Sequence, residues 1–255
     1  MRFSRAAWVA AASLLVIVPL TLPASASNAA VHPIRPTAST QVLVVSASSM
    51  STTRATLTAY SWDGSTWQRA FAPMQAYLGA NGLTDHPSES DYYTPIGQYN
   101  ITTVFGSEPD PGTLFPYRQA TPNDHWVDDP SSPYYNTWQT GPSAGRWQSA
   151  ETLSNYRLAA AFDFNQDPVI AGGDSAIFLH SGTSATLGCV TVTSTDLTTL
   201  LTWIDPADAP QIVIGVAATP PVHIDTVTTP MPWAQFNAGQ PRAVDPARSI
   251  AYTRG

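Results

Sequence analysis

The sequence is poor in charge and in cysteine, and both shortages exclude classes of protein. It has 255 residues, of which 11% are charged, and its 11 basic residues are all arginine, whereas an average domain is about 25% charged. The formal net charge of -7 argues against nucleic acid or an anionic surface as a partner. The single cysteine, Cys189, excludes an internal disulfide. No glycine-rich phosphate loop and no tight spacing of metal ligands occurs, so we predict no cofactor and no metal.

The N-terminus has the three parts of a secretory signal peptide. Arg2 and Arg5 supply positive charge, residues 6–22 are apolar, and Ala-Ser-Ala at 24–26 fits a cleavage site. We therefore predict a signal peptide over 1–26 and a secreted, extracytoplasmic protein. An uncleaved membrane anchor is the alternative, and no later segment of the sequence is apolar and long enough to span a bilayer.

The rest of the chain has strand patterns between two segments of biased composition. Residues 27–40 are rich in Ala, Pro, Ser and Thr without periodicity, and we predict a disordered lead-in there. Residues 217–255 are predicted to be a Pro/Thr/Ala-rich extension wrapped on the surface, with no assigned role. Between them, residues 41–216 are expected to form one folded domain, which is long enough for a sizeable core.

Alternating and β-branched runs predict that this domain is mainly β. Strands are expected at residues 41–47, 54–61, 65–71, 98–105, 158–164, 175–180 and 211–216, with an edge strand at 222–227. Short turns between the first three strands favour an antiparallel meander. Ser194 is expected to cap one short helix. Residues 75–91 and 106–142 are expected to be loops, the second of them an ordered, aromatic-rich cover.

The segment 175–192 combines a histidine, a glycine and the single cysteine. His180 lies nine positions before Cys189, and Gly188 directly precedes the cysteine. An imidazole can take the proton of a thiol and leave a reactive thiolate. Backbone N–H groups at a turn of small residues can stabilise the negative charge of a tetrahedral intermediate. We therefore predict thiol-nucleophile chemistry, and the alternative is a buried spectator cysteine.

Several segments, taken in order, resemble the L,D-transpeptidase (YkuD-type) catalytic domain. They are residues 93–99 (YTPIGQY), similar to the family's Thr-Pro-x-Gly-aromatic strand entry; 174–180 (DSAIFLH), similar to its histidine-bearing strand; 186–190 (TLGCV), similar to its nucleophile loop; and the helix and 211–216 (QIVIGV) strand that follow. The resemblance covers roughly residues 41–216. It implies an L,D-transpeptidase-like β-sandwich of mixed sheets with one short helix after the cysteine loop.

The resemblance also implies a reaction on peptidoglycan stem peptides. Cys189 would attack the carbonyl after the third residue of a stem tetrapeptide, with His180 as the general base. A side-chain amine of a second stem would then take the acyl group and form a 3→3 cross-link. Ser181 neighbours the base, the carbonyl of Leu187 would orient the imidazole, and the N–H groups of Gly188 and Cys189 would form the oxyanion hole. Family members are typically acylated by carbapenems at the same cysteine.

The resemblance places the substrate cleft among aromatic and amide side chains. The expected cleft residues are Tyr93, Trp126, Tyr135 and Asn136. The predicted partner is the peptidoglycan stem peptide, and the protein is expected to be associated with the cell wall. Water in place of the acceptor amine would give L,D-carboxypeptidase activity, and the sequence does not distinguish the two reactions or predict an oligomeric state.

The chain departs from the family pattern in two respects. Val190 and Thr191 occupy the places where the family usually has an arginine, so a fixed donor fork for a carboxylate is missing. The gap between histidine and cysteine is also shorter than in many members. A catalytically degenerate module that binds peptidoglycan therefore stays open as a second hypothesis. A Cys/His peptidase of another fold is the third, although those enzymes usually place the cysteine before the histidine.

Overall fold

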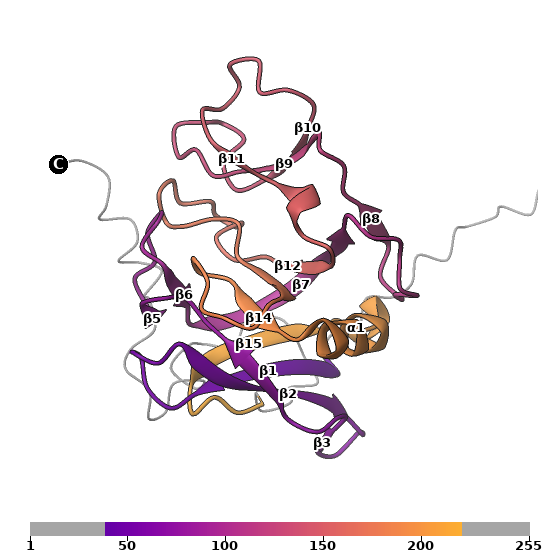
Figure 1. The fold of residues 1–255 in the computed structure, drawn as a ribbon. Coiled ribbons are helices and arrows are strands. Elements are labelled where there is room, and N and C mark those ends of the chain that lie inside the picture. Colours follow the sequence, from indigo (N-terminus) through magenta and orange to yellow (C-terminus); the bar gives the residue numbers. More distant parts are fainter. Residues whose placement is uncertain (1–38, 221–255) are drawn as a thin grey trace, which may run out of the picture. The chain divides into compact units, whose positions relative to one another are not determined.

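Apolar and β-branched residues form the strands of the described region, which is residues 39–220 of a computed structural model (Figure 1). The strands are β1 (Gln41–Ala47), β2 (Arg54–Trp62), β3 (Trp67–Arg69), β4 (Met74–Tyr77), β5 (Gly82–Thr84), β6 (Tyr93–Pro95), β7 (Gly97–Gly106), β8 (Tyr117–Gln119), β9 (Asp124–Val127), β10 (Trp138–Thr140), β11 (Ala150–Thr152), β12 (Ala159–Phe162), β13 (Phe178–Ser181), β14 (Val190–Val192) and β15 (Gln211–Val216). The helices are α1 (Ser194–Trp203) and two 3-10 turns, η1 (Leu153–Asn155) and η2 (Pro206–Asp208). The expected mainly β fold, with mixed sheets and one short α-helix after the cysteine loop, is confirmed.

Ten of the strands form one sheet that closes on itself. Its order is β1-β15-β7-β12-β13-β14-β4-β2-β3, with β8 beside β7 and with β1 also paired to β2. The pairs β1–β15 and β13–β14 are parallel, whereas β12–β13 and β14–β4 are antiparallel. Because β1 pairs on both edges, the two ends of the sheet meet and the sheet wraps around a common core.

Successive residues of β13 point to opposite faces of the sheet, as the two-residue period of a strand requires. Leu179 packs with Val190 and with Leu200 of α1 in the main core, and we call this side the helix face. Phe178 packs instead with Cys189 in a second apolar cluster, and we call this side the cysteine face. The segment between β7 and β12 supplies the side chains that pack on the cysteine face.

Part of one expected loop belongs to the main sheet. Residues 75–91 include most of β4, which lies between β14 and β2, and all of β5. The expectation of a loop was wrong for these strands. Both are too short for a clear alternating pattern: β4 buries only Met74 and Ala76, and β5 has three residues.

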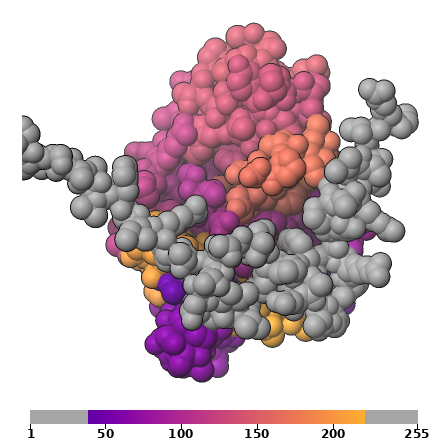
Figure 2. All heavy atoms as spheres, turned by 180° about the vertical axis from the view of Figure 1, so that it is seen from behind, coloured from indigo at the N-terminus to yellow at the C-terminus, as the bar shows by residue number. Residues whose placement is uncertain are grey.

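The second expected loop, residues 106–142, contains β8, β9 and β10. β9 pairs with both β10 and β11 in a small three-stranded sheet, so this segment is ordered as predicted but is not free of secondary structure. Seen from behind, its pink atoms form the upper part of the described surface and border the orange atoms of the segment before β13 (Figure 2). The segment thus covers the cysteine face of the sheet.

Helix α1 and its cap begin one residue earlier than the sequence predicts. Thr193 Oγ1 accepts a hydrogen bond from Asp196 N at 3.2 Å, so Thr193 is the N-cap and Ser194 is the first helical residue. Within residues 39–220, none of the helices has the length and hydrophobicity needed to cross a bilayer. The predicted signal peptide over 1–26 and the predicted edge strand at 222–227 lie outside the described residues.

Candidate active site

The two predicted catalytic side chains lie on neighbouring parallel strands. His180 is in β13, and Cys189 immediately precedes β14. The register pairs Leu179 with Val190 and His180 with Thr191, so Cys189 stands level with Phe178. Because alternate residues of a strand share a face, the side chains of Phe178, His180 and Cys189 all belong to the cysteine face. The fold therefore brings the histidine and the cysteine to one face of the sheet.

The thiol of Cys189 is buried among apolar side chains. Its Sγ atom donates to Ala176 O at 3.5 Å and accepts from Phe178 N at 3.4 Å, and the residue is 8% exposed within an apolar cluster. Burial raises the pKa of the Cys189 thiol well above its ordinary value, and the nearby carboxylate of Glu151 raises it further. Both effects favour the thiol over the thiolate in the free protein.

The imidazole of His180 is held in one tautomer by a backbone carbonyl. Nδ1 lies 3.0 Å from Ser181 O, and since a carbonyl can only accept, Nδ1 carries the proton and Nε2 keeps its lone pair. Burial lowers the pKa of His180, which favours the neutral, basic ring. The carbonyl that holds the imidazole is therefore that of Ser181, whereas the resemblance implied that of Leu187.

Tyr156 lies beside both catalytic residues. Its ring centroid is 5.0 Å from that of His180 at an interplanar angle of 78°, and it also meets the ring of Phe178 edge to face. Its hydroxyl donates to Glu151 Oε2. Burial raises the pKa of the Tyr156 hydroxyl, and negative charge on Cys189 or on Glu151 raises it further. No sequence pattern singled out this tyrosine.

The turn before Cys189 is fixed by a threonine hydroxyl and by the lack of a side chain at Gly188. Thr186 Oγ1 donates to Cys189 O at 2.6 Å and accepts from Gly188 N at 3.1 Å. Gly188 has a φ of +153°, and a Cβ atom there would lie 2.8 Å from Ile177 Cδ1 and 3.2 Å from Tyr93 O. The turn consequently requires glycine. Gly188 N is bonded to Thr186 here, so its part in an oxyanion hole stays a prediction.

The four predicted cleft residues are mostly buried and support the strand that leads to the catalytic residues. Asn136 Oδ1 accepts from Trp126 Nε1 at 2.7 Å and from Ala176 N at 3.3 Å. The hydroxyl of Tyr135 donates to Glu89 Oε1, and Tyr93 lies half-buried in β6. Contact of these residues with substrate stays a prediction.

Three carboxyl groups from different parts of the chain lie near the predicted cleft and catalytic residues. Glu89 accepts a hydrogen bond from the hydroxyl of Tyr135, and Glu151 accepts one from Tyr156. Asp174 lies just before β13. Burial raises the pKa of all three, that of Asp174 to about 8. Across the described part of the chain, no three His, Cys, Asp or Glu side chains are grouped so that they could hold a metal ion.

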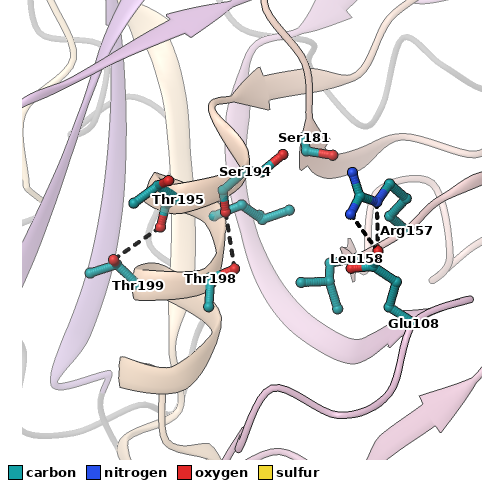
Figure 3. A pocket seen from close by; sticks show the side chains of 9 residues that line it. Glu108, Arg157, Leu158, Ser181, Ser194, Thr195, Thr198 and Thr199 are labelled. Atoms are coloured by element: carbon teal, nitrogen blue, oxygen red, sulfur yellow. Dashed lines mark hydrogen bonds and ion pairs between the residues drawn. The ribbon is translucent and has the colours of Figure 1, made fainter.

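A separate recess lies at the start of α1 (Figure 3). It has a volume of about 390 Å³ and is lined by Glu108, Arg157, Leu158, Ser181, Ser194, Thr195, Leu197, Thr198 and Thr199. The guanidinium of Arg157 is paired with Glu108 at 2.5 Å, so its charge is already neutralised. Leu197 and Leu158 belong to the core of the helix face, which places this recess away from the thiol.

A comparison with known protein families identifies the family to which this domain belongs. The family described as YkuD, the L,D-transpeptidase catalytic domain, matches residues 44–224, and this range includes every strand from β2 to β15. Comparison with curated proteins and with solved structures gave no match. Because the matched range covers most of the chain and contains His180 and Cys189, the chain belongs to the YkuD family of L,D-transpeptidase catalytic domains.

Proposed function

We propose that this chain is a secreted L,D-transpeptidase that forms 3→3 cross-links between peptidoglycan stem peptides through a cysteine acyl-enzyme. Membership of the family supports the reaction class. The observation that carries the proposal is the pairing of β13 with β14, which sets His180 and Cys189 on one face while Ser181 O holds the imidazole with Nε2 unprotonated. Export is proposed from the signal pattern at residues 1–26.

The protonation states suggest how acylation proceeds. Since burial raises the pKa of Cys189 and lowers that of His180, a resting thiolate–imidazolium pair is disfavoured. The proton passes from Sγ to Nε2 of His180 as Sγ attacks the peptide carbonyl. The imidazolium then protonates the departing amine of the terminal D-amino acid, and a thioester to Cys189 is left. Attack by an amine on this thioester forms the cross-link and returns the thiol.

The test is incubation of the purified mature chain with a disaccharide tetrapeptide, followed by mass spectrometry of the products. We expect a dimer joined through the third residues of two stems, together with the released D-amino acid. The Cys189→Ala variant is the matched control and is expected to release neither. Release of the D-amino acid without a dimer would identify an L,D-carboxypeptidase, and no turnover by the folded wild-type chain would contradict the proposal.

A second candidate is a wall-binding module without catalysis, and two observations favour it. Cys189 is 8% exposed in an apolar cluster, and Val190 and Thr191 are buried in β14 where the family usually has an arginine. This candidate predicts that insoluble peptidoglycan retains the wild-type chain and Cys189→Ala equally while stem peptides stay intact. Turnover that is lost in Cys189→Ala would exclude it.

A further inference from the structure

Two polar side-chain atoms beside the nucleophile, one on Asp174 and one on Ser175, are buried without a hydrogen-bond partner among the described residues. Asp174 and Ser175 are each 6% exposed. Asp174 Oδ1 accepts from Ser175 N at 3.0 Å, but Asp174 Oδ2 and Ser175 Oγ have no partner within the described residues. Burying an unsatisfied polar atom costs free energy, so such atoms are found where a ligand or another group completes them.

The backbone holds these atoms toward the nucleophile. Asp174 and Ala176 have φ values of +70° and +54°, a conformation that residues with a side chain seldom adopt. Neighbours maintain it, because Ala176 N donates to Asn136 Oδ1 and Asn165 Nδ2 donates to Asp174 O. As a result, the position of a Cβ atom on Gly188 is 3.7 Å from Asp174 Oδ2.

Two half-buried carboxyl groups lie near these unpartnered atoms of Asp174 and Ser175. Glu89 and Glu151 are each held by a tyrosine hydroxyl, from Tyr135 and Tyr156. The hydroxyl of Ser175 forms no hydrogen bond of ordinary geometry, yet it interacts with Glu89 and Tyr135 strongly enough to lower the pKa of both groups, so it faces that pair. The charges that raise the pKa of Asp174 are those of Glu89, Asp91 and Glu151. When ionised, these carboxyl groups repel one another, and none of the ion pairs within residues 39–220 involves Glu89, Glu151 or Asp174.

We propose that Glu89, Glu151 and Asp174, with the hydroxyl of Ser175, form a subsite that binds the side-chain ammonium group of the acyl acceptor. This inference rests on the proposed function, which supplies the thioester that the amine attacks. An ammonium group has three donors and a positive charge, so it can satisfy Asp174 Oδ2 and Ser175 Oγ and relieve the repulsion among the carboxylates. Asp174 Oδ2 lies 3.7 Å from the position of a Cβ atom on Gly188, the residue before Cys189, so the bound nitrogen would lie near the acylated sulfur.

The proton balance of this step can be written in full. The bound ammonium gives one proton to a carboxylate of the subsite, which becomes a neutral carboxylic acid, and the free amine attacks the thioester carbonyl. The nitrogen gives a second proton to Nε2 of His180 as the new C–N bond forms. The C–S bond then breaks, and the imidazolium protonates Sγ of Cys189. The products are the amide, the thiol and the carboxylic acid, which returns its proton to water.

The test uses the Cys189→Ala chain, so that its outcome does not depend on acylation. Binding of n-pentylamine, which is a cation at pH 7, is measured by titration calorimetry beside the neutral 1-pentanol. We expect the amine to bind more tightly than the alcohol. Glu151→Gln and Glu89→Gln are each expected to lower the affinity for the amine about tenfold or more and to leave the affinity for the alcohol unchanged. Glu108→Gln, in the recess at α1, is the matched control and is expected to change neither.

Three results would overturn the inference: equal affinity for amine and alcohol, unchanged affinity for the amine in both glutamine variants, or tighter binding of calcium chloride than of the amine at equal ionic strength. Circular dichroism of each variant verifies folding, and the amine–alcohol comparison on the Cys189→Ala chain needs no further substitution. Amine binding with no cross-linking by the wild-type chain would contradict the proposed function alone. Cross-linking without amine selectivity would contradict the subsite alone.

Discussion

The two faces of the β12–β13–β14 region differ in the side chains that they bury. On the helix face, Leu179, Val190 and Leu200 are fully buried among other apolar side chains, as in an ordinary core. On the cysteine face, Cys189 shares its surroundings with unpartnered polar atoms and with Asp174, a buried carboxyl group at positive φ. One face therefore supplies stability, and the other accepts strain and buried polarity in order to hold reactive groups. Substitutions on the two faces should separate these roles.

The largest expected effect is on the cysteine face, at the base. His180→Ala should lower the rate of acyl-enzyme formation about 10²–10⁴-fold, because no group is left to take the thiol proton. Intact-mass kinetics with a tetrapeptide donor measure this rate. The matched control is His86→Ala, since the side chain of His86 is 70% exposed. An acylation rate within about twofold of wild type for His180→Ala would remove the imidazole from the mechanism.

The next effect concerns the turn that presents the nucleophile. Gly188→Ala places a Cβ atom 2.8 Å from Ile177 Cδ1 at a φ of +153°, so the turn must shift. A misplaced nucleophile costs about 10²-fold in rate, and we expect a loss of this size in acylation by the same assay. Gly112→Ala is the control for strain alone, because Gly112 has a φ of +99° with no atom near its Cβ position. Equal activity of the two variants would show that the turn does not need its glycine.

On the helix face the expected change is in stability. Leu200→Ala removes a fully buried side chain from the main core and should lower the free energy of unfolding by about 2–5 kcal/mol. Urea denaturation followed by fluorescence measures this change. Leu114→Ala is the control, because Leu114 is 57% exposed and should cost far less. The folded Leu200→Ala protein should acylate at the wild-type rate, and a large loss of rate would mean that the two faces are coupled.

The last expected effect is a change in the pH dependence of stability. Burial raises the pKa of Asp174 from 3.8 to about 8, so between these values the folded chain binds a proton that the unfolded chain has lost. Stability should therefore fall as pH rises from about 4 to about 8, with a slope of at most about 1.4 kcal/mol per pH unit from this group. Asp174→Asn should reduce that slope.

The measurement for Asp174 is the urea midpoint of wild type and variant at pH 5 and at pH 8. Asp110→Asn is a suitable control, since backbone donors lower the pKa of Asp110 and the group is ionised in both states over this range. The pH dependence of Asp110→Asn should match that of wild type. An unchanged slope in Asp174→Asn would show that Asp174 ionises freely in the folded chain.

The helix face and the nucleophile strands were predictable because their signals are local. Runs such as residues 41–47 and 211–216 combine apolar and β-branched residues with turn residues at their ends, and α1 follows a hydroxyl cap. The order of His180, Gly188 and Cys189 along the chain also identified the reacting pair. The register that places them on one face could not be derived, because it depends on the parallel pairing of β13 with β14.

The surroundings of the thiol could not be predicted for a related reason. Glu89 is far along the chain from Glu151 and Tyr156, and no sequence pattern links them. Only the fold brings Tyr135 to Glu89 and packs Tyr156, bonded to Glu151, on the cysteine face. Burial, which the sequence did not indicate, raises the pKa of the Cys189 thiol. The carbonyl that orients His180 was expected at Leu187 by resemblance, and in the structure it is that of the neighbouring residue, Ser181.

The central claim is that Cys189 is a nucleophile that can be reached and acylated. Intact-mass spectrometry of the mature chain after exposure to a carbapenem tests it most directly. The account predicts one covalent adduct of the intact drug on the wild-type chain, mapped to the peptide that contains Cys189, and none on Cys189→Ala. A folded wild-type chain that stays unmodified, or an adduct that persists in Cys189→Ala, would contradict it.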